Sequence, residues 1–182
     1  MHPHHSVLHF EKLKYYPIFL DLRGRRVLVA GAGKVALRKT RGLVGAGALV
    51  TVVAPVIRPE FRELPVRLIE RRYRVSDLRG AALVFAATDD RAVNRQIGAA
   101  ARHRAILANI ADAAEECDFI VPARVQHGIV EIAIATGGRN PRVSAELRRK
   151  LESNAGGLVA GPSRPARSGI AASTPRGKIK TS

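Results

Sequence analysis

One acidic residue stands out in this chain because it follows a run of apolar residues typical of a buried strand. Asp112 comes directly after AILANIA (105–111), and Glu115, Glu116 and the single cysteine, Cys117, follow it. The placement suggests an acid held at the mouth of a site, where a carboxylate could take part in chemistry. The alternative is an acid in an ordinary loop. We expect Glu115 and Glu116 at the surface and Cys117 as a packed thiol.

A second candidate for chemistry is the glycine-rich sequence GAGKVA (31–36). It directly follows the apolar run RRVLVA (25–30) and opens a segment of helical composition. This arrangement matches the G-x-G-x-x-A pattern, in which Gly31 permits a tight turn and Gly33 lets backbone N–H groups approach a pyrophosphate. The pattern predicts a dinucleotide site, with a purely structural glycine turn as the alternative.

The residues after the next apolar run bear on the choice between NAD and NADP. In many dinucleotide sites an acid at this point binds the ribose 2′-hydroxyl. Here the segment VTVVAPVIRPE (50–60) has no acid at the strand end and carries Arg58 nearby. The position therefore does not select NAD, and Arg58 leaves NADP open.

Two later loops could also contact a ligand. Thr88 follows an apolar run, although Thr88 or Asp89 could instead cap the next helix. The sequence TGGRNP (136–141) leads into a helix with Asn140 as its expected N-cap, and free N–H groups there favour an anion. A plain glycine-rich turn is the alternative at the second loop.

The elements that must hold these residues alternate between apolar runs and helical segments. The predicted strands are 25–30, 48–55, 65–73, 81–90 and 105–111, and the predicted helices between them are 33–47 and 91–104. This alternation predicts an α/β fold, a Rossmann-like doubly wound parallel sheet, with ligands at the carboxyl ends of its strands. After Asp112 the pattern changes to two consecutive strands (118–126 and 128–138) and a helix (141–153), which predicts a small α+β region with a hairpin.

Composition divides the chain further and limits its class. An N-terminal extension (1–14) precedes the Rossmann domain (15–112), and the α+β region (113–154) leads into a segment (155–182) with five Lys/Arg and no acid, which we expect to be a disordered basic tail. One cysteine allows no internal disulfide, which favours the cytoplasm. The longest apolar run, ALVTVVAPVI, is too short to span a membrane.

The net charge of +16 favours an anionic partner. Nucleic-acid binders commonly add aromatic side chains to a basic surface. Here aromatic residues make up 4% and the arginines are scattered through every segment, which argues against general nucleic-acid binding.

Four segments, taken in order, resemble the precorrin-2 dehydrogenase family, which forms the N-terminal module of siroheme synthase. They are YYPIFLDLRGRRVLVAGAGKVALRKTRGLVGAGALVTVVAP, FAATDDRAVNRQI, NIADAAEECDFIVPA and IAIATGGRNPRVSAELRRKLE, within about residues 15–153. The most specific part is TDD…VN followed by N-x-x-D…DFI-x-PA. The resemblance implies oxidation of precorrin-2 to sirohydrochlorin with NAD as hydride acceptor, followed in some members by insertion of ferrous iron.

The resemblance also implies roles for single residues. Asp112 matches the family's catalytic aspartate and is the expected general base. The residues expected at the cofactor are Gly31, Gly33, Lys34, Val35, Pro55, Val56 and Thr88. Those expected at the tetrapyrrole are Asn109, Thr136, Gly137 and Arg139. Since the substrate carries eight carboxylates, the candidates to bind them, on position alone, are Arg124, Arg139 and Arg142.

The chain departs from the family after Ser153, where members usually continue into a helical domain that supports a homodimer and the substrate cleft. The expected homodimer and the iron step depend on that domain. Two other functions fit the same residues. One is a non-catalytic dinucleotide-binding regulatory module, for which Asp112 would be dispensable. The other is a basic nucleic-acid-associated protein that binds through 155–182.

Overall fold

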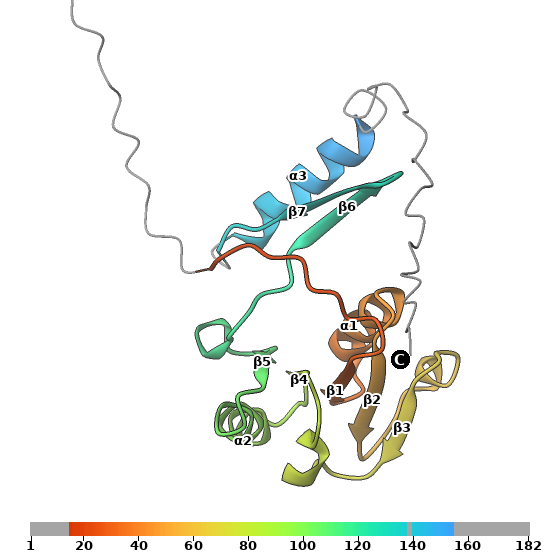
Figure 1. Cartoon of the computed structure of the whole chain (residues 1–182), viewed down its shortest axis with the longest axis vertical. Coiled ribbons are helices and arrows are strands. Elements are labelled where there is room, and N and C mark those ends of the chain that lie inside the picture. The colour runs from red at the N-terminus through yellow and green to blue at the C-terminus, as the bar shows by residue number, and fades with distance from the viewer. Residues whose placement is uncertain (1–14, 138–139, 155–182) are drawn as a thin grey trace, which may run out of the picture.

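A computed structural model describes residues 15–137 and 140–154. The N-terminal extension, the basic tail and Arg139 lie outside this part of the chain. Figure 1 shows a sheet-containing unit and a second, smaller unit beside it. The strands are β1 (Arg26–Ala30), β2 (Leu49–Ala54), β3 (Arg67–Glu70), β4 (Leu83–Ala86), β5 (Leu107–Ile110), β6 (Ala123–His127) and β7 (Val130–Ile134). The helices are α1 (Lys34–Gly45), α2 (Arg91–Arg102) and α3 (Pro141–Ser153), with short 3₁₀ turns η1 (Pro59–Phe61), η2 (Val75–Leu78) and η3 (Ala114–Glu116).

The first unit is a five-stranded parallel sheet in the order β3-β2-β1-β4-β5. Its strands are nearly continuous apolar runs because both faces are covered. In β1, Val27 and Val29 pack into the core on the α1 side, whereas Leu28 and Ala30 pack into the core on the α2 side. This arrangement confirms the predicted Rossmann-like doubly wound fold.

The strand order places a switch point at β1: the chain runs from β1 to β2 and β3 on one side of it, and then crosses to β4 and β5 on the other side. At such a point the connections leave to opposite faces of the sheet and open a crevice at the carboxyl ends of the strands. The loops after β1, β2 and β4 therefore meet at one edge. These are the loops that carry the predicted cofactor residues.

The second unit consists of the antiparallel hairpin β6–β7 with α3 packed against it (Figure 1). As expected, Asn140 caps α3, with its side-chain oxygen accepting a hydrogen bond from Val143 N at 3.3 Å. The predicted strand from 118 was wrong at its start, since β6 begins at Ala123. Asp118 instead pairs with β5, donating from its backbone N to Ala108 O at 2.9 Å. No helix in the described residues is long and apolar enough to cross a membrane.

Candidate functional site

The loop after β1 is shaped by two glycines with different surroundings. Gly31 has a φ of +106°, and a Cβ there would lie 2.1 Å from Ala87 O, so only glycine fits between β1 and the end of β4. Gly33 is the N-cap residue just before α1, and a Cβ there would meet nothing within 4 Å. Gly31 thus serves the packing of the sheet, whereas Gly33 borders open space where a ligand can approach.

The N-terminus of α1 is suited to an anion. Its cap residue, Gly33, makes no side-chain hydrogen bond to the first turn, and no acidic residue lies in that turn. The first N–H groups of a helix lack partners within the helix and carry the positive end of its dipole. A dinucleotide pyrophosphate fits this arrangement of groups.

Two exposed valines lie on the same edge of the sheet. Val35 in the first turn of α1 is 43% exposed, and Val56 in the loop after β2 is 76% exposed. Lys34 and Pro55, which precede them, are exposed as well. Apolar side chains beside a helix N-terminus can cover the sugar and base of a dinucleotide while the backbone binds its phosphates.

Arg58, which left NADP open in the sequence, already has a partner. Its Nη2 lies 2.7 Å from Glu60 Oε1, and this hydrogen bond is the main cause that lowers the pKa of Glu60. A ribose phosphate would therefore compete with the Glu60 carboxylate for this arginine.

Thr88 follows β4, but its hydroxyl is committed to neighbouring groups. Thr88 Oγ1 lies 2.7 Å from Asn94 Oδ1 and 3.0 Å from Asp90 O, and donates to one or the other. The N-cap of α2 is Asp90, whose Oδ1 accepts hydrogen bonds from Ala92 N at 2.8 Å and Val93 N at 3.2 Å. The expectation that Thr88 or Asp89 caps this helix was therefore wrong.

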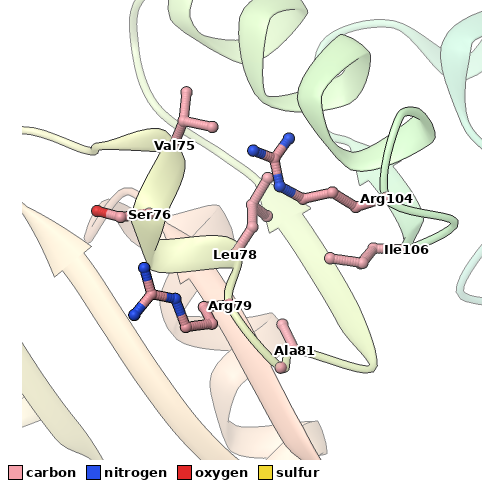
Figure 2. A pocket seen from close by; sticks show the side chains of 8 residues that line it. Val75, Ser76, Leu78, Arg79, Ala81, Arg104 and Ile106 are labelled. Atoms are coloured by element: carbon pink, nitrogen blue, oxygen red, sulfur yellow. The ribbon is translucent and has the colours of Figure 1, made fainter.

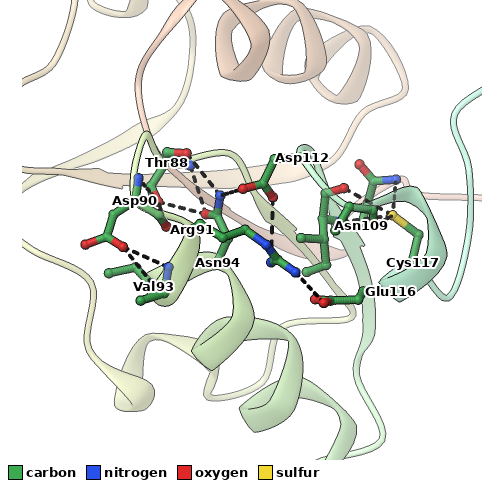
Figure 3. Close-up of polar contacts among 12 residues, drawn as sticks. Thr88, Asp90, Arg91, Val93, Asn94, Asn109, Asp112, Glu116 and Cys117 are labelled. Carbon is green, nitrogen blue, oxygen red and sulfur yellow. Dashed lines mark hydrogen bonds and ion pairs between the residues drawn. The ribbon is translucent and has the colours of Figure 1, made fainter.

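Asp112 lies just after β5, beside the start of α2 (Figure 3). Its Oδ2 accepts a hydrogen bond from Asn94 Nδ2 at 3.1 Å, and its Oδ1 lies 3.9 Å from Arg91 Nη1. The side chain is 37% exposed, so a substrate can reach it. The carboxylate is thus held on one oxygen and accessible at the same time.

Arg91 also pairs with Glu116, and this bond raises the pKa of Arg91 above its ordinary value. The Glu116 side chain is only 25% exposed and lies against α2 (Figure 3). Glu116 is therefore partly buried, whereas Glu115 is exposed, as expected. By sharing the guanidinium, Glu116 leaves Asp112 with a weaker ion pair than an isolated arginine would form.

Asn109, a predicted substrate residue, is only 6% exposed and points toward α1. Its Oδ1 accepts a hydrogen bond from Lys39 Nζ at 2.7 Å, and its Nδ2 donates to Phe119 O at 2.9 Å and contacts Cys117 Sγ at 3.6 Å. Burial is the main cause that lowers the pKa of Lys39, which lies 5.2 Å from the centroid of the Phe85 ring. These contacts give Asn109 a structural role and do not support a substrate contact.

Cys117 is 7% exposed, as expected of a packed thiol. Its Sγ lies 3.1 Å from Ile110 N and 3.2 Å from Ile110 O, so that it bonds to the backbone of β5.

The remaining predicted substrate residues belong to the second unit. Thr136 Oγ1 donates to Asn140 O at 3.0 Å or to Ser144 Oγ at 3.3 Å, so its hydroxyl joins the end of β7 to α3. Gly137 is exposed, with a φ of +62°. The structure thus places both residues in the β7–α3 loop, and their contact with a tetrapyrrole stays a prediction.

Of the arginines proposed for the substrate carboxylates, the two that the structure describes, Arg124 and Arg142, are exposed. Arg124 in β6 forms an ion pair with Glu131 at 3.3 Å, across the hairpin. Arg142, in the first turn of α3, is exposed. Among the described residues, no group of three or more His, Cys, Asp or Glu side chains gathers as a metal site.

A separate hollow of about 380 Å³ lies at the opposite edge of the sheet (Figure 2). It is lined by Val75, Ser76, Leu78, Arg79, Gly80, Ala81, Arg104 and Ile106. Ala81 and Ile106 come just before β4 and β5, so this hollow faces the amino ends of the strands. It is therefore distinct from the edge that carries Asp112 and the glycine loop.

Sequence reasoning missed three side chains that hold the site together: Lys39, Arg91 and Asn94. Lys39 contacts Asn109 on β5, and the other two contact Asp112. The only sequence signal for any of them is the VN of TDD…VN, in which Asn94 appears.

Comparison with known proteins relates this geometry to a family. Residues 18–123, more than half of the chain, match a family model described as putative NAD(P)-binding. The siroheme synthase of Pseudomonas fluorescens (strain Pf0-1) is 44% identical to this chain over 144 residues, and that of Chromobacterium violaceum is 43% identical over 145 residues. These matches cover 77% and 78% of this chain and 31% of each relative, so the chain spans about a third of the length of those proteins.

Among solved structures, SirC, a precorrin-2 dehydrogenase, superimposes with a TM-score of 0.68 at 32% sequence identity. The match covers 77% of this chain and 71% of SirC. The chain therefore belongs to the NAD(P)-binding family that includes precorrin-2 dehydrogenase.

Proposed function

We propose that this chain is an NAD-dependent dehydrogenase that oxidises precorrin-2 to sirohydrochlorin in siroheme synthesis. The observation that carries the proposal is the position of Asp112. This accessible carboxylate follows β5 at the same edge of the sheet as the glycine loop after β1. A proton acceptor and a dinucleotide can therefore face one substrate from neighbouring strands.

The residues at the glycine loop fit the cofactor. The open space at Gly33 and the uncapped first turn of α1 would hold the pyrophosphate, and Val35 and Val56 would cover the rest of the dinucleotide. Lys34, Pro55 and the backbone of Thr88 border the same edge. Bound NAD⁺ would supply the hydride acceptor.

Asp112 would take the proton that leaves the tetrapyrrole when the hydride departs, so that the substrate loses two hydrogens in all. Among the described residues, the polar interaction of its Oδ1 is the ion pair with Arg91 Nη1 at 3.9 Å, and no hydrogen bond is made to this oxygen. That oxygen is therefore the one placed to accept the proton. Asn94 holds the other oxygen and keeps the carboxylate in place.

The charge of the chain suits the substrate. A tetrapyrrole with many carboxylates is strongly attracted to a protein of net charge +16, and arginines are well suited to bind its periphery. Arg124 and Arg142 are the described candidates for these contacts. We further propose that residues 15–112 form the dinucleotide domain and 113–154 the substrate and dimer region.

Iron insertion, a homodimer and a cytoplasmic location complete the proposal. The name of the relatives, siroheme synthase, supports ferrous iron as a second substrate, for which Asp112 would accept the pyrrole protons.

A homodimer is supported by exposed apolar side chains on the second unit. These are Ile129 (102% exposed), Val130 (38%), Val143 (41%) and Leu147 (43%).

An anaerobic assay tests the dehydrogenase. Precorrin-2 generated in the same vessel is mixed with NAD⁺ and the protein, and absorbance follows sirohydrochlorin and NADH. We expect Asp112→Asn to lower kcat by about 10²- to 10⁴-fold while the fold and NAD⁺ binding persist, because the base is lost. Glu63→Gln, which neutralises an exposed acid outside the site, is the control.

Three results would point elsewhere. Unchanged turnover in Asp112→Asn would remove that residue from the reaction. No turnover by a folded wild-type protein that binds NAD⁺ would favour the regulatory module. DNA binding that falls steeply with salt and disappears without 155–182 would favour the nucleic-acid-associated protein.

A further inference from the structure

We propose that Asn94 is a positioning residue that fixes the Asp112 carboxylate relative to the cofactor edge of the sheet. This inference rests on the proposed function, because it concerns the reaction assigned to Asp112. Asn94 lies in the first turns of α2 and is completely buried, with 0% exposure. A buried amide is costly unless its polar atoms find partners, so its contacts define its role.

The side-chain amide of Asn94 uses its full capacity for hydrogen bonds (Figure 3). Its Oδ1 faces Thr88 N at 3.1 Å and Thr88 Oγ1 at 2.7 Å. Its Nδ2 donates to Thr88 O at 3.0 Å and to Asp112 Oδ2 at 3.1 Å. The group thus binds the backbone of one loop and the carboxylate of another.

Only one orientation of the amide satisfies these partners. A flipped amide would place its NH₂ group against the Thr88 N–H and its carbonyl against the Asp112 carboxylate. Aspartate has the same shape but no donor for Thr88 O or Asp112, and leucine would leave the Thr88 backbone groups unpaired. The site therefore needs the donor and acceptor that asparagine combines.

The two partners of Asn94 belong to the two halves of the proposed reaction. Thr88 follows β4, which lies beside β1 and its glycine loop, whereas Asp112 follows β5. Hydride and proton leave the same substrate, so the cofactor edge and the base must keep a fixed separation. The bonds to Thr88 hold the loop after β4 to α2, and the bond to Asp112 is the one that sets this separation.

A substitution that replaces the Asn94 NH₂ donor by an acceptor oxygen tests this role. Asn94→Asp keeps the oxygen that accepts from Thr88 N. It also puts a carboxyl oxygen in the place of Nδ2, which lies 3.1 Å from Asp112 Oδ2. Two carboxyls this close share a proton. Arg91 is the charged group beside Asp112, at 3.9 Å, and it interacts in turn with Glu115 and Glu116; all three are unchanged in this variant.

In the dehydrogenase assay we expect Asn94→Asp to shift the acid limb of the kcat/KM profile to higher pH by about one unit or more, as in other like-charge pairs. We expect kcat to fall by about tenfold or more, because the base is misplaced and protonated. Asn154→Asp, the same change at the exposed end of α3, is the matched control. An unchanged pH profile and kcat in the folded variant would show that residue 94 does not act on the base.

A second measurement uses the wild-type protein and needs no activity. The NMR signals of the Asn94 side-chain NH₂ group should follow the titration of a carboxyl group, and Asp112→Asn should abolish that titration. No titration of these signals in the folded wild type would overturn the contact. This measurement also decides the case in which Asn94→Asp does not fold.

The outcomes separate the two proposals. An active wild type whose pH profile and kcat are unaffected by Asn94→Asp would refute the positioning role and leave the dehydrogenase standing. A wild type that binds NAD⁺ but never oxidises precorrin-2, while the Asn94 signals still follow Asp112, would refute the dehydrogenase and keep the contact.

Discussion

The two glycines of the loop after β1 should respond to the same substitution in opposite ways. Gly31→Ala adds a methyl group 2.1 Å from Ala87 O and 2.5 Å from Ala87 C, both backbone atoms that cannot move without separating β1 from β4. The residue also has a φ of +106°, which L-residues rarely adopt. Gly33→Ala adds the same methyl group where nothing lies within 4 Å, at a φ of −79°.

The expected magnitudes follow from these surroundings. For Gly31→Ala, backbone strain of about 1–3 kcal/mol and overpacking of about 1–3 kcal/mol lower the free energy of unfolding by about 2–6 kcal/mol. For a chain of this size, that loss lowers the Tm by about 4 to 24 °C. For Gly33→Ala, the lost flexibility of the unfolded chain offsets the poorer helix cap, so the Tm changes by less than about 4 °C.

The affinity for NAD⁺ should show the opposite pattern, with the larger effect in Gly33→Ala. The Gly33→Ala methyl group occupies the space through which the pyrophosphate approaches the helix, and we expect Kd to rise by about tenfold or more, equivalent to about 1.4 kcal/mol. Thermal melting by circular dichroism and titration calorimetry with NAD⁺ give the two quantities. Wild-type stability of Gly31→Ala, or wild-type affinity of Gly33→Ala, would refute the roles given to these residues.

Three further predictions concern single side chains. Asp77 accepts hydrogen bonds from Arg71 at 2.6 and 2.9 Å, and this lowers its pKa, so its contribution to stability is complete above pH 3.8 and is lost as the pH falls below that value. Asp77→Asn should cost about 1–3 kcal/mol in urea unfolding at pH 7, and no loss would contradict the pairing. Burial raises the pKa of Tyr73 to about 12, so stability should fall as the pH rises from 10 toward 12, and Tyr73→Phe should remove that fall in alkaline urea titrations. Cys117, 7% exposed and the chain's single cysteine, should react with a thiol reagent about 100-fold more slowly in the native protein than in urea, and equal rates would contradict its burial.

Most of the architecture was predictable from the sequence, because apolar residues are spaced differently in its strands and in its helices. Both faces of the sheet are covered, so the strands are short and almost wholly apolar, and the helices between them have the length of a crossover. Strand ends were less predictable. The predicted strand 81–90 ends at Ala86, because Thr88 and Asp90 leave the sheet to bond with each other and with α2.

The candidate site was predictable only in part. The acid after β5 and the glycine loop are local signals, and both lie at the expected edge of the sheet. The direction of Asn109 was not predictable, because its partner, Lys39, is 70 residues away in the sequence. The role of Asn94 was not predictable for a different reason: its partners are only 6 and 18 residues away, but a polar residue in an amphipathic helix is expected to be exposed.

The loop after Asp112 affects whether copies of the chain can pair through the edge of the sheet. β5 is an edge strand, and its outward backbone groups at Ala108 and Ile110 could pair with a strand from another molecule. Asp118 binds Ala108 N through Oδ2 at 2.8 Å and Ala108 O through its own N at 2.9 Å, while the Cys117 thiol covers Ile110 N and O. The same short segment that follows the proposed base therefore closes the β5 edge of the sheet to strand addition, and variants at Asp118 should aggregate before they lose activity.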